Sequence, residues 1–340
     1  MDIGELNAIA GKMVTKGKGI LAADESTGTI KKRFDAIGVA NTEENRRDYR
    51  ELMFRSGEAM KHISGVILYD ETIRQKAKDG TALVKLIEDA GAVPGIKVDA
   101  GAKPLAASKG ETITEGLDGL RERLIEYHKL GARFAKWRAT YDPTEGRPSF
   151  NCINANAQAL ARYAALCQEQ GIVPIVEPEV LMDGDNDIDT CGAVTEWVLK
   201  ETFQQLYYAN VALEGMILKP NMVISGKKAS VRAGVDEVAE KTVTILKRCV
   251  PGAVPGIAFL SGGQSDEEAT AHLNAMNAKH PHLPWALTFS YGRALQHAPQ
   301  KAWSGKAENV PAAQAAFTHR AKMNGMATTG AWKKDLEKAA

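Results

Sequence analysis

The sequence predicts an α/β protein folded as a single (β/α)8 barrel, the TIM-barrel architecture, and three observations lead to that prediction. Eight short apolar runs recur along the 340 residues, each opening near a glycine or small residue and ending in polar or charged ones. Their starts lie about 30 to 45 residues apart, which leaves room for one crossover helix between strands. No linker or low-complexity tract divides the chain, so we expect one barrel domain over residues 1–340, with a polar C-terminal tail from about residue 325.

The expected strands occupy residues 19–24, 65–70, 95–99, 132–137, 172–177, 215–219, 256–261 and 285–290. Because these runs are nearly continuous in apolar residues and do not alternate, they should be parallel strands covered on both faces. A doubly wound open sheet is the competing architecture. The Gly-x-Gly-x-x-Gly turn that normally follows one of its early strands is absent from this sequence.

Helical signals fill the segments between the strands. Asn41 followed three residues later by Glu44 is a helix-start signal, and the apolar residues after it share one face: Tyr49, Leu52, Met53 and Met60. Two further stripes each stop at a glycine before a strand: Leu120, Leu124 and Tyr127 before Gly131, and Leu160, Tyr163 and Cys167 before Gly171.

The amino-acid composition argues against several classes of function. The 43 Lys and Arg residues nearly balance the 42 Asp and Glu residues, which argues against a nucleic-acid or other polyanion binder. With 44% hydrophobic and 25% charged residues, the chain has the composition of an ordinary globular protein. It contains neither an apolar stretch long enough to span a membrane nor a signal-peptide pattern at its start, so we expect a cytoplasmic protein that does not engage membranes.

Cysteine and histidine spacing predicts no metal site. The cysteines never approach Cys-x-x-Cys spacing and should be reduced thiols, mostly in the core: Cys152, Cys167, Cys191 and Cys249. The seven histidines fall mainly in expected helices and loops, away from the strand ends. We therefore expect neither a metal nor another cofactor.

Charge gathers at the expected C-terminal ends of the strands, where barrels of this kind carry their active sites. The residues concerned are Asp24, Glu25, Lys97, Asp99, Lys136, Arg138, Glu177, Glu179 and Lys219. A solvated strand end would explain any one of them alone, but their convergence on one barrel mouth favours a shared site. The expected mouth has more cations than acids, which suits a small substrate with two phosphates.

Lys219 is the most informative of these residues. It ends an apolar run and precedes Pro220, so its amine has little access to water. A desolvated lysine near another cation, such as Lys136, holds its proton less tightly and becomes a nucleophile suited to Schiff-base chemistry with a carbonyl substrate. The alternative is a structural ion pair with Glu177 or Glu179.

Carboxylates at the same mouth are candidates for proton transfer, because forming an imine and breaking a carbon–carbon bond need several such steps. Asp24, Glu177 and Glu179 are the candidates, although each could merely balance the lysines. Asp99 is better explained as a structural partner of a lysine.

Two small turns after the last two strands are candidates for an anion site: Ser261, Gly262 and Gly263 in one, and Ser290, Gly292 and Arg293 in the other. Glycines let backbone N–H groups approach an anion, and an arginine can clamp a phosphate. A tight turn would explain one such run, but two at adjacent strands favour phosphate. A second anion could be held after the first strand, where a solvated helix start is the alternative, by Ser26, Thr29, Lys32 and Arg33.

Seven blocks of the sequence together resemble class I fructose-bisphosphate aldolases. They are residues 21–28 (LAADESTG), 95–99 (GIKVD), 135–138 (AKWR), 176–179 (VEPE), 213–222 (LEGMILKPNM), 259–265 (FLSGGQS) and 287–293 (LTFSYGR). The resemblance spans about residues 5–325, and its LKPNM block is highly specific to that family. It implies the same barrel and a cofactor-free glycolytic lyase, usually homotetrameric, that reversibly splits fructose 1,6-bisphosphate into dihydroxyacetone phosphate and glyceraldehyde 3-phosphate.

Carried over by motif, the resemblance implies that Lys219 forms the Schiff base and that the iminium accepts the electrons released when the C3–C4 bond breaks. Glu177 would act as acid and base, Lys136 would lie beside the carbinolamine, and Asp24 would lie at the C4 hydroxyl. The C1 phosphate would be held by Ser261, Gly262, Ser290, Gly292 and Arg293. The side facing the C6 phosphate would be lined by Ser26, Thr29, Lys32, Arg33, Lys97 and Arg138.

The sequence departs from the animal members of that family at its end, where they carry a mobile tail whose terminal tyrosine assists proton exchange at the enamine. No tyrosine follows Tyr291 here, so that role is absent, or is taken by another group or by water. Two rival functions remain: a transaldolase-like enzyme that also uses a lysine, and a non-catalytic binding protein on the same fold. The preference between fructose 1,6-bisphosphate and fructose 1-phosphate is also open at this point.

Overall fold

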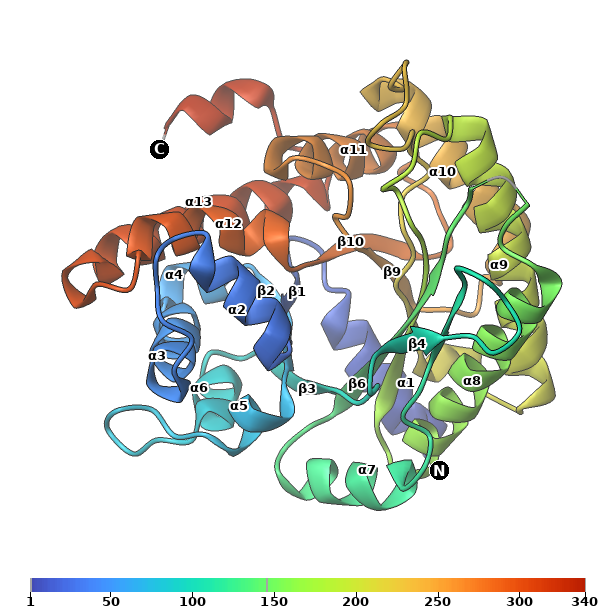
Figure 1. The fold of residues 1–340 in the computed structure, drawn as a ribbon. Coiled ribbons are helices and arrows are strands. Elements are labelled where there is room, and N and C mark those ends of the chain that lie inside the picture. Colours follow the sequence, from blue (N-terminus) through green and yellow to red (C-terminus); the bar gives the residue numbers. More distant parts are fainter. Residues whose placement is uncertain (1, 145, 340) are drawn as a thin grey trace.

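The computed structural model describes residues 2–144 and 146–339 and has a closed barrel at its centre (Figure 1). The barrel strands are β1 (Gly19–Ala23), β2 (Ile63–Leu68), β3 (Val93–Lys97), β6 (Phe134–Tyr141), β7 (Val173–Val180), β8 (Ile217–Leu218), β9 (Gly256–Phe259) and β10 (Ala286–Tyr291). Neighbouring strands are parallel, and β1 closes the ring by pairing with both β2 and β10. The predicted (β/α)8 barrel is therefore confirmed.

Helices surround the barrel (Figure 1). The longer ones are α2 (Thr27–Asp35), α3 (Glu43–Phe54), α7 (Leu120–Lys129), α8 (Phe150–Glu169), α9 (Ile188–Tyr208), α10 (Val235–Cys249), α11 (Asp266–Lys279), α12 (Arg293–Trp303) and α13 (Val310–Ala327). The shorter ones are α4 (Gly57–Met60), α5 (Asp70–Arg74), α6 (Leu83–Asp89), η1 (Leu213–Gly215), η2 (Ala307–Asn309) and η3 (Lys334–Ala339). An antiparallel hairpin of β4 (Ala102–Pro104) and β5 (Thr112–Thr114), which the sequence patterns did not predict, follows β3.

The helix α1 (Ile3–Met13) closes the N-terminal end of the barrel. Its buried side chains Leu6, Ala10 and Met13 belong to the same apolar cluster as residues inside the barrel. Near the start of β2, the Ser64 hydroxyl donates a 2.5 Å hydrogen bond to the Met13 carbonyl. The open end of the barrel is therefore the one where the strands finish.

Phe134 fills part of the barrel interior, and Gly95 on the neighbouring strand β3 makes room for it. A Cβ atom at residue 95 would lie 2.3 Å from the Phe134 ring, closer than carbon atoms can approach. Gly95 was expected to open a strand, but it lies inside β3. Its small size serves packing and does not mark the start of the strand.

Some element boundaries differ from the prediction in ways that affect the site. The strands β6 and β7 run further than expected, so Arg138 and Glu179 lie within strands instead of beyond them. The strand β8 is short, and Lys219 extends its direction by donating its backbone N–H to the Val176 carbonyl at 2.8 Å. The helix α3 is capped by Thr42, so the predicted start at Asn41 was wrong by one residue.

The segment after α13 lies against α11 and α13. The Trp332 backbone N–H donates to the Asn274 side-chain oxygen at 2.9 Å, and the Trp332 indole N–H donates to Glu337 at 2.9 Å. Glu337 also contacts His319 at 2.8 Å and forms an ion pair with Arg320. These contacts hold the C-terminal segment on the helical shell.

The cysteines are free thiols, buried at Cys152, Cys167 and Cys191 and half-buried at Cys249. Within residues 2–144 and 146–339, no group of three or more His, Cys, Asp or Glu side chains is arranged to hold a metal ion. In the same ranges, no helix combines the length and apolarity needed to cross a membrane.

Candidate active site

The open end of the barrel holds a pocket of about 540 Å³. It is lined by the predicted site residues Asp24, Ser26, Thr29, Arg33, Lys97, Lys136, Arg138, Glu177, Glu179, Lys219, Ser261, Gly262, Ser290, Gly292 and Arg293. These residues come from seven of the barrel strands and from the turns and helices that follow them. The convergence of charged strand ends on one mouth, expected from the sequence, is thus what the folded chain contains.

Two predicted residues, Lys32 and Gly263, do not line this pocket. Lys32 is exposed on α2. Gly263 has φ +75° and lies against Met182, whose Cγ would be 2.2 Å from a Cβ atom at residue 263. Gly263 therefore shapes the turn after β9 and does not present a group to the pocket.

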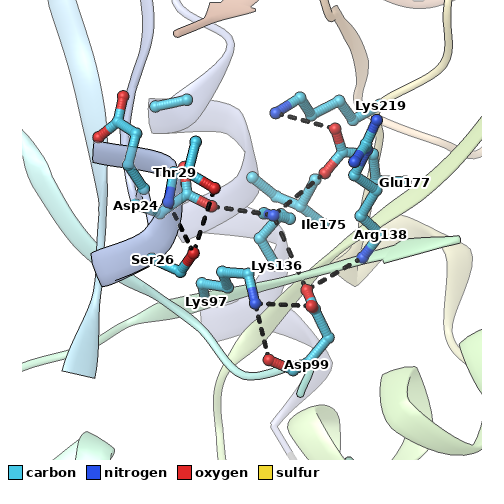
Figure 2. Close-up of polar contacts among 12 residues, drawn as sticks. Asp24, Ser26, Thr29, Lys97, Asp99, Lys136, Arg138, Ile175, Glu177 and Lys219 are labelled. Atoms are coloured by element: carbon cyan, nitrogen blue, oxygen red, sulfur yellow. Dashed lines mark hydrogen bonds and ion pairs between the residues drawn. The ribbon is translucent and has the colours of Figure 1, made fainter. Parts of the chain in front are cut away.

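Four charged side chains, which we call the floor cluster, contact one another in the pocket: Asp24, Lys136, Glu177 and Lys219 (Figure 2). The Lys136 ammonium lies 2.9 Å from Asp24 Oδ2 and 3.5 Å from Glu177 Oε2. The other oxygen of Glu177, Oε1, lies 3.2 Å from the Lys219 ammonium. Glu177 thus bridges two amines, and no more than 12% of any of these four side chains is exposed.

Burial and charge act in opposite directions on this cluster. Burial disfavours the ionised form of Asp24, but the nearby ammonium groups of Lys136 and Lys219 outweigh it and lower the pKa of Asp24 to about 2. Burial likewise disfavours protonated Lys136, but the charges of Asp24, Glu177 and Asp99 prevail and raise the pKa of Lys136 well above its ordinary value. Asp24 and Lys136 are therefore a fixed ion pair at neutral pH.

The remaining cations of the pocket each have a close carboxylate, and we call these contacts the rim pairs. Lys97 lies 2.6 Å from Asp99, Arg33 pairs with Glu25, and Arg138 pairs with Glu179. Arg293 lies 3.1 Å from Asp266, which is outside the pocket lining. The cationic side chains are 16 to 44% exposed, more than those of the floor cluster.

The ends of β9 and β10 contribute small, mostly uncharged groups to the pocket. The Ser290 side chain is 1% exposed, and its hydroxyl has no hydrogen-bond partner among the described residues. Gly292 caps the N-terminus of α12, where backbone N–H groups and the helix dipole favour an anion. This end of the pocket can therefore hold a phosphate.

Glu25 was noted in the sequence only as part of a strand end, but it is a buried member of the pocket lining. It accepts a 2.8 Å hydrogen bond from the Gln296 amide and pairs with Arg33, and the Arg50 guanidinium lies 3.8 Å away. Its position directly after Asp24 was the only available signal. With Glu25 inside and Lys32 outside, the lining charges nearly balance, so the expected excess of cations was too large.

Comparisons with known proteins agree with this arrangement. The model of the glycolytic family "Fructose-bisphosphate aldolase class-I" matches residues 5–340. A probable fructose-bisphosphate aldolase class 1 from Xanthomonas campestris is 59% identical over 98% of this chain and 100% of that protein. A cytosolic fructose-bisphosphate aldolase from Arabidopsis thaliana is 54% identical over 98% of this chain and 85% of that protein.

A solved structure is also similar. It is fructose-bisphosphate aldolase from Plasmodium falciparum in complex with TRAP and a small-molecule inhibitor, and it superposes with a TM-score of 0.96. It is 50% identical to this chain and covers 97% of it, and 96% of the solved chain is covered in return.

Proposed function

The chain belongs to the class I fructose-bisphosphate aldolase family, and from that membership we propose the part that each pocket side chain takes in the reversible cleavage of fructose 1,6-bisphosphate through a lysine Schiff base. The observation that carries the proposal is the carboxylate of Glu177, which lies 3.2 Å from Lys219 and 3.5 Å from Lys136. One acid in contact with two buried amines can pass protons where an imine forms.

The first step is attack of the Lys219 amine on the C2 carbonyl of the open-chain sugar. Lys219 must give up a proton to become a nucleophile, and Glu177 Oε1 is within reach to take it. Lys136 stays protonated beside the same site, so it stabilises the carbinolamine oxygen and the negative charge that develops there. One proton then passes from the attacking nitrogen to the carbinolamine oxygen. Glu177 returns the proton it took, so that the oxygen leaves as water and the iminium remains.

Cleavage of the C3–C4 bond follows. A proton leaves the C4 hydroxyl, the bond electrons move into the iminium to give an enamine, and glyceraldehyde 3-phosphate departs. An acid with a pKa of about 2 accepts protons poorly at neutral pH, so Asp24 orients the hydroxyl and holds Lys136. Glu177, which has already returned its first proton, takes the C4 proton in this proposal, and protonation at C3 followed by hydrolysis of the iminium releases dihydroxyacetone phosphate.

The two phosphates occupy different parts of the pocket in this proposal, and Arg33 lies between them, because its Nη2 would be 3.6 Å from a Cβ atom at Gly292. The C1 phosphate lies at the β9 and β10 strand ends, with Ser261, Gly262, Ser290, Gly292 and Arg293. The C6 phosphate lies toward Ser26, Thr29, Arg33, Lys97 and Arg138. We place Glu179 in this second group through its ion pair with Arg138, so its part is to position that guanidinium.

Two further parts of the proposal concern the whole protein. We propose that it is cytoplasmic, since cytosolic aldolases from Arabidopsis thaliana are among its relatives. We also propose a homotetramer, because that assembly is usual in the family.

Trapping the imine tests the proposal. Sodium borohydride added with dihydroxyacetone phosphate should reduce the imine to a stable secondary amine, and peptide mass spectrometry should find the added mass on Lys219. Lys136, which is also buried in the pocket, serves as the internal control and should stay unmodified. Full activity after treatment, with Lys219 unmodified, would overturn the proposal.

A further inference from the structure

Arg293 has three partners within the protein, although its side chain is 43% exposed. Its Nη1 lies 3.1 Å from Asp266 Oδ1, and its Nη2 donates to the backbone carbonyls of Ser261, at 3.2 Å, and Gln264. Asp266 is the first residue of α11, directly after the turn that follows β9. A phosphate in the pocket would meet a guanidinium that already has a negatively charged partner.

We infer that Asp266 competes with the substrate phosphate for Arg293, so that this carboxylate weakens phosphate binding and shortens the residence of phosphorylated ligands. The inference rests on the proposed function in one respect, which is the assignment of Arg293 to the C1 phosphate. Asp266 itself lies outside the pocket lining and acts only through Arg293.

The chemistry of the pair favours competition. Carboxylate and phosphate oxygens both bind the planar guanidinium through the same N–H groups, so one nitrogen cannot satisfy both fully. The two backbone carbonyls are neutral, and an arginine that turns toward a phosphate gives up less by leaving them than by leaving a full charge. Asp266 is therefore the partner that decides how readily Arg293 is released.

The ionised carboxylate of Asp266 also keeps favourable surroundings when the Arg293 guanidinium turns toward a phosphate. Its carboxylate is in the first turn of α11, where the helix dipole favours a negative charge, and Oδ2 lies 3.6 Å from His297 Nδ1. Its backbone is held in place because its carbonyl accepts hydrogen bonds from the Thr270 hydroxyl at 3.0 Å and from Arg320 at 3.5 Å. Exchange of partners thus requires side-chain rotation only.

The test uses the full-length protein with D266N and, as a matched control, E267Q. Glu267 is the next residue of α11, is exposed and has no ion pair or side-chain hydrogen bond among the described residues, so E267Q removes the same charge without touching Arg293. The probe is glycerol 3-phosphate, which carries one phosphate and no carbonyl that could form an imine. Its competitive inhibition constant is measured against fructose 1,6-bisphosphate.

We expect D266N to lower the inhibition constant roughly two- to fivefold, the range of a partly exposed ion pair, while kcat does not rise. The E267Q protein should stay close to the parent. The variant D266S, which also suits a helix start, should reproduce D266N, and thermal unfolding should verify that all variants are folded. An unchanged or raised inhibition constant in D266N and D266S, or equal decreases in D266N and E267Q, would overturn the inference.

The variant R293Q distinguishes the assignment of Arg293 to the C1 phosphate from the competition by Asp266. If R293Q weakens glycerol 3-phosphate binding while D266N leaves it unchanged, the phosphate assignment stands and the competition is refuted. If R293Q has no effect on binding, the assignment of Arg293 fails, and the inference that rests on it fails with it.

Discussion

The floor cluster and the rim pairs are built from the same residue types but arranged differently. In the floor cluster, Glu177 contacts two amines, and Lys136 contacts both Glu177 and Asp24. In the rim pairs, each cation has one close carboxylate and keeps part of its surface in water. Shared contacts make the floor cluster a single unit. The rim consists mostly of separate pairs, although Asp99 also lies 3.8 Å from Lys136 and Glu25 lies 3.8 Å from Arg50.

This difference decides how each region responds to change. Removing one member of a buried, shared network leaves its neighbours charged and unpaired, which costs several kcal/mol and alters every proton transfer nearby. Removing the partly exposed cation of a rim pair should cost less, because water can reach part of the space it leaves. We therefore expect chemistry to depend on the floor cluster and affinity for phosphate to depend on the rim.

The largest effect is expected from breaking the floor cluster. E177Q and K136M should each lower kcat by roughly 10²- to 10⁴-fold, because both take part in the same proton transfers. The double variant should be little worse than the poorer single one, since residues that act as a unit are not additive. Steady-state kinetics with circular dichroism as a folding control will measure this, and multiplicative losses would show that the two side chains act independently.

The next effect concerns stability and pH. The folded-state pKa of Asp24 is about 2, below its ordinary value of 3.8, so its ion pair stabilises the fold above about pH 4 and is lost as pH falls toward 2. The contribution is about 2 kcal/mol. D24N should therefore lower the free energy of unfolding by at least that amount at pH 7 and by less at pH 3, as measured by urea titration. A difference that grows on acidification would contradict this assignment.

A smaller effect is expected at the rim. K97M removes a cation from the end of the pocket proposed for the C6 phosphate, so it should raise KM for fructose 1,6-bisphosphate about tenfold through loss of one charge-assisted contact. KM for fructose 1-phosphate should change less than twofold. The control is K31M, since Lys31 is exposed on α2, pairs with Asp35 and does not line the pocket. Equal changes for both sugars would place the C6 phosphate elsewhere.

The smallest effect should come from Glu179, which the sequence offered as a catalytic acid. Its carboxylate pairs with Arg138 on the neighbouring strand and forms no ion pair with Lys219 or Lys136 among the described residues. E179Q should therefore lower kcat less than tenfold, far less than E177Q, and act mainly on KM. A loss as large as that of E177Q would move Glu179 into the floor cluster.

Much of this protein could be predicted from local sequence. The apolar runs, their spacing and the glycines between them predict eight strands with helices between them. This is possible because the burial of a strand and the periodicity of a helix both depend on residues that are close together in the sequence. Lys219 could be singled out for the same reason, since the apolar run before it and Pro220 after it are adjacent in the chain. The strands and the charged residues expected at their ends could thus be predicted from the sequence alone.

Which acid meets which amine was decided by the tertiary structure. In the barrel register, Lys97 is paired with Lys136, and Arg138 with Glu177, across neighbouring strands. A shift of the register by one residue would turn these side chains to the other face of the strand. The sequence of one strand alone does not determine its register with the neighbouring strand. Closure of the barrel therefore brings Asp24 to Lys136 and Glu177 to Lys219, because these contacts join residues that are distant in sequence. The same closure leaves Lys32 outside the pocket lining.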